Sequence, residues 1–417
     1  MLLVDLLEVV LLAFFSFIFG WTVYNLPALL VGVRQLKRKA AAERPFGKGE
    51  AAFGLPFFSL IVPMKDEGRV AERILGALVR LDYPSDKYEV LVIEDGSVDE
   101  THDVCREYEG MCPGRIRVFH RESQPGKPSA LNYALQFARG DVIGVFDADN
   151  LPEADVLRRA AEHFRSGEVV ALQGLLSSIN ADQNMLTKFI HYENILQYSA
   201  FFAGRDRLGL FVPFAGTCQF IMRRVLEEVG GWSDVALAED MELAARLTEK
   251  GYHVKFASDV RCLQENPSSF SQLAGQRARW FRGCMDVAVK YGRLLKRLER
   301  RSLDAEIFFS GPFVMVLFLL TYLLGLYAFF VPFNFGVYTG VLTQFTSFVT
   351  LFVLFLLGVG LAYASRPRRI SNVKWLPFIY LYWTTQVFVA FYAFLQIVLR
   401  RPARWMRTLH TGVVTNH

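Results

Sequence analysis

Long uncharged stretches occupy both ends of the chain. No charged residue occurs in Val9–Val33, in Ile307–Ser365 or in Trp375–Leu399. A helix needs about 20 apolar residues to cross the hydrocarbon core of a membrane. The first and last stretches therefore each predict one helix, and the middle stretch predicts two helices joined by a turn at 331–336. Buried core helices seldom run this long without a charge, so we expect an integral membrane protein.

Between these stretches, after a polar linker at 40–54, short β-branched runs alternate with helical ones. Continuous apolar strands that alternate with helices are typical of a mainly parallel sheet covered by helices on both faces. Ligands of such Rossmann-like α/β sheets bind beyond the carboxyl ends of the strands. The strands are predicted at 59–63, 88–93, 115–120 and 141–146, and the helices at 69–81, from 99 onward, and at 127–138.

Basic residues that border the apolar stretches predict the orientation of the chain. One cluster at 34–39 and another at 290–301 flank the α/β region. Lysine and arginine are enriched on the cytoplasmic side of membrane helices, so we expect residues 40–302 to be cytoplasmic. The arginines at 366–369 and at 400–407 also indicate the cytoplasm, although only one apolar stretch separates them. That last stretch is therefore re-entrant or interfacial, or it is an exception to the charge rule.

The composition agrees with this division into apolar stretches and an α/β region, and it gives no reason to expect nucleic-acid binding or a cysteine metal site. Of the 417 residues, 52% are hydrophobic and 14% are aromatic. The net charge of +5 comes largely from the lysines and arginines that flank the membrane stretches, so no nucleic-acid partner is implied. The five cysteines lack the C-x-x-C spacing of metal sites, and they fit reduced thiols in the cytosol.

Carboxylates follow three of the predicted strands. Asp, Gly and Ser are ordinary turn formers, so the run Glu94–Ser97 predicts by itself no more than a turn. Asp147 and Asp149 are more informative, because residues two apart in an extended chain point the same way. Two carboxylates at one site repel each other unless a cation lies between them, and oxygen ligands suit Mg²⁺ or Mn²⁺. We therefore predict a divalent metal site at Asp149 and Asp147.

The motifs and their order resemble the family-2 inverting glycosyltransferases of the GT-A fold. The likeness is greatest to the membrane-integrated branch that contains the cellulose, chitin, hyaluronan and poly-N-acetylglucosamine synthases, and it runs from about residue 59 to residue 280. Two departures leave the important carboxylates in place: Glu94 stands where the family often has aspartate, and Ala238 where it commonly has threonine. The residues that carry the resemblance are Val62-Pro63, Asp66-Glu67, Glu94-Asp95-Gly96-Ser97, Gly126-Lys127-Pro128, Asp147-Ala148-Asp149, Gly216-Thr217, Gly230-Gly231-Trp232, Glu239-Asp240 and Gln276-Arg277-Ala278-Arg279-Trp280.

The resemblance implies how a nucleotide-sugar donor is bound. Asp95 would contact the nucleotide base, and Lys127 would help to hold the donor, although a lysine at a helix start is also common on protein surfaces. Asp149 would hold the metal with support from Asp147. The other residues expected to line the donor cleft are Val62, Pro63, Asp66, Glu67 and Glu94.

The resemblance also implies a catalytic base. Asp240, next to Glu239, would remove the proton of the acceptor hydroxyl while the metal steadies the departing diphosphate. The structural alternative is that this pair only caps a helix predicted at 241–250, whose first turn favours negative charge.

A further motif combines binding with membrane contact. Gln276, Arg279 and Trp280 share one face of a helix. The Arg279 guanidinium matches diphosphate oxygens, and the Trp280 indole offers a flat surface for an acceptor. An amphipathic helix that lies on the membrane has the same pattern, and the two interpretations are compatible. The apolar face of 187–202 predicts a second interfacial helix, with core packing as the alternative.

These inferences predict a membrane-bound inverting glycosyltransferase that transfers a sugar to a growing polysaccharide or a lipid-linked acceptor. The family's habit leads us to expect a UDP-sugar as the donor. Single transfer to a sphingolipid or polyprenyl phosphate is the first alternative, and a nucleotide-sugar-sensing transporter is the second. A polymerising enzyme with about four spans would need a homo-oligomer or a partner subunit. The expected division is 1–35 membrane helix, 36–55 linker, 56–264 GT-A domain, 265–302 interfacial helices, 303–402 membrane helices and 403–417 tail.

Overall fold

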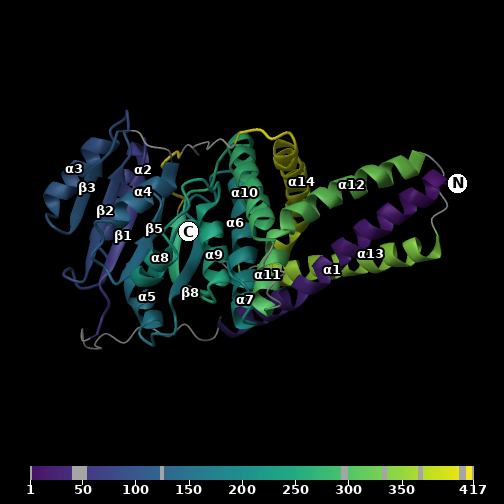
Figure 1. The fold of residues 1–417 in the computed structure, drawn as a ribbon, viewed down its shortest axis with the longest axis horizontal. Helices are drawn as coiled ribbons and strands as arrows, with labels where there is room; N and C mark the ends of the chain where they lie inside the picture. The colour runs from purple at the N-terminus through teal and green to yellow at the C-terminus, as the bar shows by residue number, and fades with distance from the viewer. Residues whose placement is uncertain are drawn as a thin grey trace.

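The structure, a computed structural model, has an α/β domain at one end and a bundle of apolar helices at the other (Figure 1). The N-terminus lies at the tip of the bundle, and the C-terminus lies at the domain. The predicted linker (40–54) and turn (331–336) lie outside the described residues apart from their last residues, as do the arginines at 366–369. The described residues are 2–39, 54–122, 126–292, 299–330, 336–364, 370–402 and 410–415.

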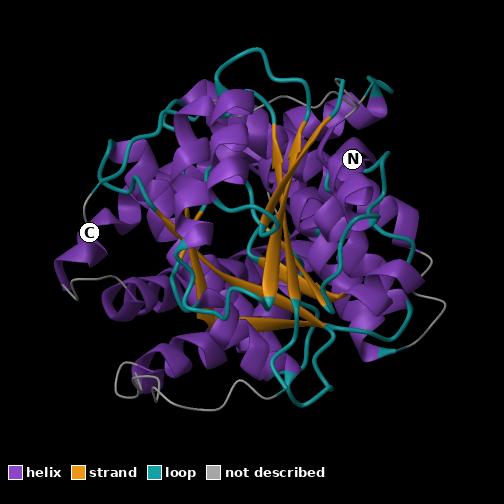
Figure 2. Cartoon of the chain, turned by 90° about the vertical axis from the view of Figure 1, so that its left-hand side faces the viewer, coloured by secondary structure: helices purple, strands orange, loops and turns teal. Residues whose placement is uncertain are grey.

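An eight-stranded sheet forms the centre of the domain, in the order β3-β2-β1-β4-β7-β6-β8-β5. The four strands predicted from the sequence form its parallel half, with β1 between β2 and β4. In the other half β7 is antiparallel to β4 and β6, whereas β6 and β8 are parallel. Figure 2 shows the strands enclosed by helices, which confirms the predicted fold class. The strand bounds are β1 Phe58–Met64, β2 Tyr88–Glu94, β3 Ile116–His120, β4 Val142–Val145, β5 Leu151–Pro152, β6 Ala171–Ser178, β7 Gln219–Met222 and β8 Val254–Gln264.

Helices cover the sheet because their apolar residues recur on one face. In α2, for example, Val70, Ile74 and Leu78 are spaced by four, and all three are buried against the sheet. The strands β1 and β2 are buried along nearly their whole length, as expected of parallel strands between two helical layers. The helices of the domain are α2 Gly68–Val79, α3 Thr101–Met111, α4 Gly126–Leu135, α5 Val156–Phe164, α6 Met185–Asn194, the π-helix η1 Ile195–Phe202, α7 Ala203–Arg207, α8 Arg223–Glu228, α9 Glu239–Glu249 and α10 Phe270–Tyr291.

The apolar end contains the predicted membrane helices. Among the described residues, three helical segments are long and apolar enough to cross a membrane, and the pair α11–α12, bent by 45°, is a fourth candidate. Figure 1 shows α1, α12 and α13 projecting together from the domain, whereas α14 runs beside α10 and across their direction. The bounds are α1 Leu2–Lys39, α11 Arg300–Phe309, α12 Gly311–Phe330, α13 Val337–Ala364, the short 3-10 helix η3 Ile370–Trp375, and α14 Leu376–Val398.

Small residues allow α1 to approach the domain very closely. A Cβ added at Gly32 would lie 1.8 Å from the Ala200 carbonyl oxygen, and one added at Gly204 would lie 1.8 Å from that of Ala28. Two helices with small residues four apart can bring their backbones together in this way. Residues 187–202, predicted as an interfacial or core helix, thus form the layer between the sheet and α1 as α6 and η1.

A fully buried ion pair stabilises the same junction. Arg205 of α7 lies 2.6 Å from Asp304 of α11, and both side chains are 0% exposed. Arg205 also donates to Asn25 of α1 at 3.1 Å, and the Tyr24 hydroxyl donates to Asp304 at 2.8 Å. The pair therefore connects the domain to both the first and the next membrane-side helix.

Removal of one member of this pair should destabilise the protein strongly. Asp304→Asn leaves the Arg205 guanidinium buried without its counter-charge, and we expect a loss of about 3–5 kcal/mol in the free energy of unfolding. Thermal unfolding in detergent measures the effect. Glu109→Gln is the control, since its pair with Arg106 is exposed and should contribute less than about 1 kcal/mol. Equal melting temperatures for the two variants would contradict the assignment.

Candidate active site

One cavity of about 820 Å³ lies beyond the carboxyl ends of β1, β2 and β4, where the sequence predicts ligand binding. It continues from the carboxylates to apolar side chains of the membrane helices. Of the predicted site residues, those that line it are Pro63, Glu67, Asp95, Lys127, Asp147, Asp149, Glu239, Asp240, Gln276, Arg279 and Trp280. The apolar residues contributed by the membrane helices include Leu26, Leu29, Met315, Val353 and Leu357.

Three predicted residues lie behind the cavity wall. Val62 is part of the buried sheet core. Asp66, in the left-handed region at φ 51°, accepts a hydrogen bond from the Val98 amide at 2.8 Å and so fixes the loop that follows β2. Glu94 is buried beside two histidines. Direct contact of these three with a nucleotide remains a prediction, and their positions favour an indirect role.

Lys127 is the main cation among the carboxylates. Its ammonium group binds Asp147, lies 2.8 Å from the Gly216 carbonyl oxygen and 3.8 Å from Glu239. Burial alone would lower the pKa of Lys127, but Asp147 and Glu239 outweigh it and raise the pKa. Lys127 therefore stays charged, and it is placed to meet a diphosphate.

Asp240 has the properties of a general base. It begins α9 with Glu239 and lines the cavity beneath the membrane helices. Burial, reinforced by the charge of Glu239, raises the pKa of Asp240 to about 7. A carboxylate that titrates near neutral pH can accept a proton from a hydroxyl more readily than an ordinary one.

The carboxylates around Asp149 fit a divalent cation. The Asp149 side chain accepts from the Glu265 amide at 3.1 Å and from Asn150 at 3.1 Å, which fixes its orientation. Burial, with repulsion from Asp147 and Glu67, raises the pKa of Asp149 even though His410 acts against it. A site with this excess of buried negative charge is suited to Mg²⁺ or Mn²⁺, whose preferred ligands are oxygens.

A histidine from the C-terminal tail completes this cluster. His410 lies 2.8 Å from Glu67 and 3.6 Å from Asp149. Burial acts to lower its pKa, but Asp149 and Glu67 prevail and raise the pKa to about 9. The Thr411 amide donates to Glu265 at 2.5 Å, and the Thr415 amide to the Ile179 carbonyl at 3.0 Å. The segment 410–415 is thus bound to the domain at the carboxylate site.

Arg121, which is not part of the sequence motifs, binds Asp95, the residue predicted to contact the nucleotide base. The Nε of Arg121, just after β3, donates to Asp95 at 2.9 Å. Arg121 also lies over the Tyr133 ring at 5.3 Å and donates to the Ser129 carbonyl at 3.1 Å. The only sequence signal was an arginine at the end of the third predicted strand, a position that the β2–β3 pairing brings beside Asp95.

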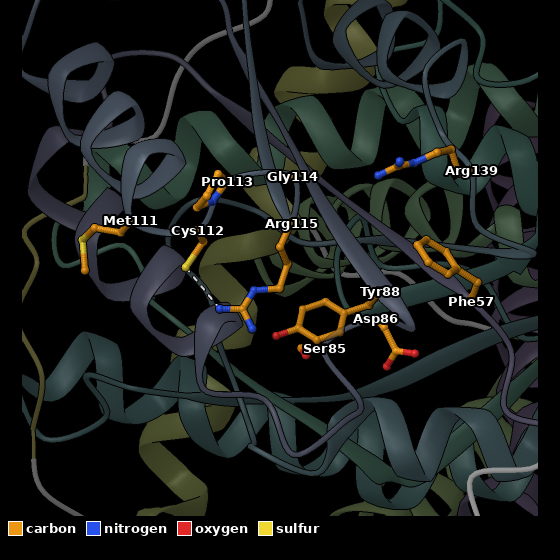
Figure 3. Close-up of a pocket in the computed structure, with 10 residues that line it drawn as sticks. All are labelled: Phe57, Ser85, Asp86, Tyr88, Met111, Cys112, Pro113, Gly114, Arg115 and Arg139. Atoms are coloured by element: carbon orange, nitrogen blue, oxygen red, sulfur yellow. Dashed lines mark hydrogen bonds between the residues drawn. The ribbon is translucent and has the colours of Figure 1, made fainter.

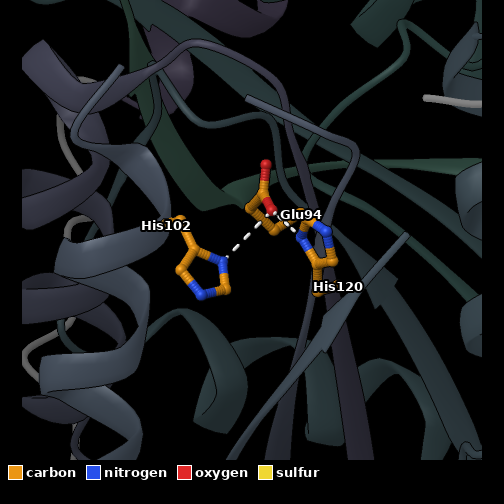
Figure 4. Close-up of side chains that lie close together, drawn as sticks. All are labelled: Glu94, His102 and His120. Carbon is orange, nitrogen blue, oxygen red and sulfur yellow. Dashed lines mark hydrogen bonds and ion pairs between the residues drawn. The ribbon is translucent and has the colours of Figure 1, made fainter. Parts of the chain in front are cut away.

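Figure 4 shows Glu94 between His102 and His120. Its carboxylate lies 2.5 Å from Nδ1 of His120 and 3.3 Å from Nδ1 of His102, and it accepts from the Ser97 amide at 2.5 Å. The three ligand atoms are within 4.8 Å of one another, close enough for an ion. Burial favours a higher pKa for Glu94, but these hydrogen bonds outweigh it and lower the pKa. The carboxylate is therefore already satisfied, and the cluster fixes the strand end that carries Asp95.

The helix α10 carries the Gln276–Trp280 motif along the cavity. Arg277 pairs with Glu193 of α6 at 2.7 Å and lies over the Trp280 ring at 4.7 Å. The Tyr382 hydroxyl of α14 donates to the same Glu193 at 2.9 Å. This network joins three helices and positions Trp280 at the cavity.

A second depression, of about 600 Å³, lies at the opposite ends of the strands. Figure 3 shows Arg115 beside Tyr88 and hydrogen-bonded to Cys112 at 3.1 Å. Its lining residues precede β1, β2, β3 and β4, and ligands of such sheets bind at the other edge. The carboxylate cavity is therefore the candidate active site.

The fold and the cavity are those of an α/β enzyme that binds its ligands beyond the carboxyl ends of the strands, and comparison with known proteins identifies the family. The model of the glycosyltransferase-like family 2 matches residues 56–283, more than half of the chain, and the chain belongs to this family. Its fold is shared with the mannosyltransferase PcManGT from Pyrobaculum calidifontis, solved in complex with GDP-Man and Mn²⁺, at a TM-score of 0.61 and 19% identity over 93% of this chain and 100% of that one.

Two curated relatives are more similar in sequence. The probable glycosyltransferase YdaM of Bacillus subtilis is 33% identical over 258 residues, 61% of this chain and 61% of YdaM. A beta-monoglucosyldiacylglycerol synthase of Nostoc sp. is 29% identical over 295 residues, 69% of this chain and 62% of the synthase. The chain thus matches less than two thirds of the length of these relatives.

Replacement of the predicted metal ligand should weaken metal binding strongly. In Asp149→Asn the site loses a buried charge but keeps its shape, and we expect about a 100-fold weaker affinity for Mn²⁺ in the presence of UDP or GDP. Titration of the purified protein by calorimetry measures this without turnover. Asp82→Asn, a change at an exposed carboxylate outside the cavity, is the control. Unchanged Mn²⁺ affinity in Asp149→Asn would place the metal elsewhere.

Proposed function

We propose that the chain is a membrane-bound, metal-dependent inverting glycosyltransferase that transfers one sugar from a nucleotide-sugar to a lipid acceptor at the cytoplasmic face of a membrane. The observation that carries the proposal is the continuity of the cavity. The same space is lined by Asp149 and Asp240 at one end and by Leu29 of α1 and Leu357 of α13 at the other. Acyl or prenyl chains fit those apolar walls, and a hydroxyl at the carboxylate end would be within the reach of a base.

The residues divide the proposed reaction between a donor side and an acceptor side. Asp149 and Asp147 would hold a divalent cation, which supplies positive charge for the departing diphosphate. Lys127 and Arg279 would bind the same oxygens directly. Asp240 would accept the proton of the acceptor hydroxyl as that oxygen attacks the anomeric carbon from the side opposite the leaving group. One such displacement inverts the anomeric configuration.

A lipid acceptor accounts for the cavity better than a growing polysaccharide does. Leu26 and Leu29 of α1 and Val353 and Leu357 of α13 supply walls that a lipid chain fits and that offer a glycan no side-chain hydrogen bonds, although Trp21 of α1 also lines the cavity. The name of the Nostoc relative, a beta-monoglucosyldiacylglycerol synthase, supports the same choice. A polymerising role in the cellulose and chitin synthase branch is therefore the second possibility, and the family membership disfavours a transporter without catalysis.

The position of the C-terminal tail supports a topology in which α14 does not cross the membrane. His410 and Thr411 contact Glu67 and Glu265, so the tail is on the catalytic side. If α12 and α13 both cross the membrane, the chain returns to the catalytic side after α13. A further crossing by α14 would place the tail on the opposite side. An interfacial α14, running across the direction of the other helices in Figure 1, also keeps the arginines at both of its ends in the cytoplasm.

Cysteine labelling tests this topology. In a Cys112→Ser background, whose other cysteines are buried, Ser371→Cys and Arg400→Cys mark the two ends of the α14 segment. Both should react with a membrane-impermeant maleimide from the cytoplasmic side, and Tyr338→Cys, at the exposed start of α13, from the other side. If Ser371→Cys and Arg400→Cys react from opposite sides, then α14 spans the membrane.

Donor turnover by the purified protein tests the proposed function. With Mn²⁺ or Mg²⁺ and a mixture of membrane lipids, one of a panel of UDP- and GDP-sugars should yield a glycolipid of inverted anomeric configuration. Asp240→Asn should lower kcat by about 100-fold or more. In the unmutated protein kcat/KM should fall as the pH drops below about 7, where the raised pKa leaves Asp240 protonated.

The exposed Asp103→Asn is the matched control and should keep both rate and pH profile. Polysaccharide as the product would refute the lipid acceptor and favour the polymerising alternative. Full activity of Asp240→Asn would exclude Asp240 as the base.

A further inference from the structure

An amide side chain in the membrane-side part of the cavity has no partner within the described protein. Gln386 of α14 is only 3% exposed, and it lines the cavity that contains Asp240 and Trp280. Neither its amide oxygen nor its amide nitrogen has a hydrogen-bond partner among the described residues. A buried polar group in this condition costs more free energy than a typical hydrogen bond contributes, so a persistent example needs a reason.

The nearest polar network cannot supply that partner. One turn away on α14, Tyr382 donates to Glu193, and the same Glu193 oxygen accepts from Arg277. The Glu193 oxygen accepts both of these bonds, and neither Tyr382 nor Arg277 bonds to Gln386; the Arg277 Nε is itself a buried donor without a partner among the described residues. The residues of α14 around it, such as Ile379, Val389 and Ala390, are apolar and buried. Because Gln386 lines the cavity, a ligand bound there can supply both a donor and an acceptor.

We propose that Gln386 binds the carbonyl-bearing linkage of a neutral two-chain lipid acceptor, its amide NH₂ donating to an ester or amide carbonyl oxygen. The inference rests on the lipid-transferase function proposed above and narrows its acceptor. Diacylglycerols and ceramides carry a carbonyl and a free hydroxyl close together, and that hydroxyl can donate to the Gln386 oxygen or extend to Asp240. A polyprenyl phosphate has no carbonyl and presents an ionised nucleophile that needs no base.

The proposed position of α14 gives this contact the right depth. The ester and amide linkages of membrane lipids lie at the boundary between headgroups and acyl chains, which is where an interfacial helix lies. Gln386 would then bind the ester or amide linkage, and the apolar residues of α1, α12 and α13 would pack against the acyl chains. The acceptor hydroxyl would point toward α9.

The test pairs a change in the protein with a change in the lipid. Gln386→Met keeps the volume and removes both polar ends, and Gln396→Met, on the same helix but outside the cavity lining, is the control. The acceptors are a diacylglycerol, its dialkyl ether analogue without carbonyls, a ceramide and a polyprenyl phosphate, in detergent with the preferred donor.

In the unmutated protein and in Gln396→Met, the acceptor KM should be about tenfold lower for the diester than for the diether, as one buried hydrogen bond allows. In Gln386→Met the two lipids should have equal KM values, while the donor KM stays within about twofold of normal. The melting temperature without lipid should not fall, because the change removes an unsatisfied group. A purely structural role would instead lower the melting temperature and weaken donor and acceptor alike.

The outcomes separate the inference from the function on which it rests. If no lipid accepts sugar from any donor, the proposed function fails. If lipids are acceptors but the unmutated protein shows no preference for ester over ether, or if Gln386→Met keeps that preference, the inference fails and the function stands. Turnover of polyprenyl phosphate alone also overturns it. Should Gln386→Met not fold, the absence of an ester preference in the unmutated protein would still overturn the inference.

Discussion

Several carboxylates are held together under a bundle of apolar helices, and the repulsion between them is the interaction on which the other features of this molecule depend. Asp147, Asp149 and Asp240 line one cavity, and burial raises the pKa of the last two. Such a cluster is stable only when positive charge is brought to it. Lys127 supplies part of that charge from α4, and His410 supplies part from the other end of the chain. The same unfavourable concentration of negative charge makes the site ready for a divalent cation, and the cation together with Lys127 would in turn attract a diphosphate.

The contact between domain and membrane helices has to be rigid for this arrangement to last. The cavity has walls from both, so any slippage of α1 against η1 would open the carboxylates to water. Gly32 and Gly204 allow backbone-to-backbone packing at that contact, and the buried Arg205–Asp304 pair ties α1, α7 and α11 together. A buried ion pair contributes little net stability, but its directional bonds define a single arrangement of the parts it joins. The predicted membrane helices are in this sense part of the candidate active site.

Sequence patterns predicted the features that depend on local order. The continuous apolar runs of β1, β2 and β4 identified the parallel half of the sheet, and the rule for such sheets located the cavity. The other, mixed half of the sheet was not predicted; two of its strands, β5 and β7, are only 2 and 4 residues long and have no distinct period. Arg121 and His410 were not predicted because their partners are distant along the chain. Arg121 is 26 residues from Asp95, and His410 is 343 residues from Glu67. No local pattern records such a pairing. Gln386 likewise resembled any polar residue in an apolar helix until its lack of a partner was visible.

The two ends of the cavity place opposite demands on a substrate, and this limits what the acceptor can be. If Asp240 is the base, as proposed, the acceptor has to offer a hydroxyl with a proton to remove, since a carboxylate with a raised pKa cannot help an oxygen that is already ionised. Among the apolar helices the acceptor would fill a space lined by residues such as Leu29, Val353 and Leu357. Between them lies the α10–α14 wall, where Trp280 is held by Arg277 and Gln386 has both amide ends free among the described residues. An uncharged lipid with a polar linkage between its hydroxyl and its chains satisfies all three requirements.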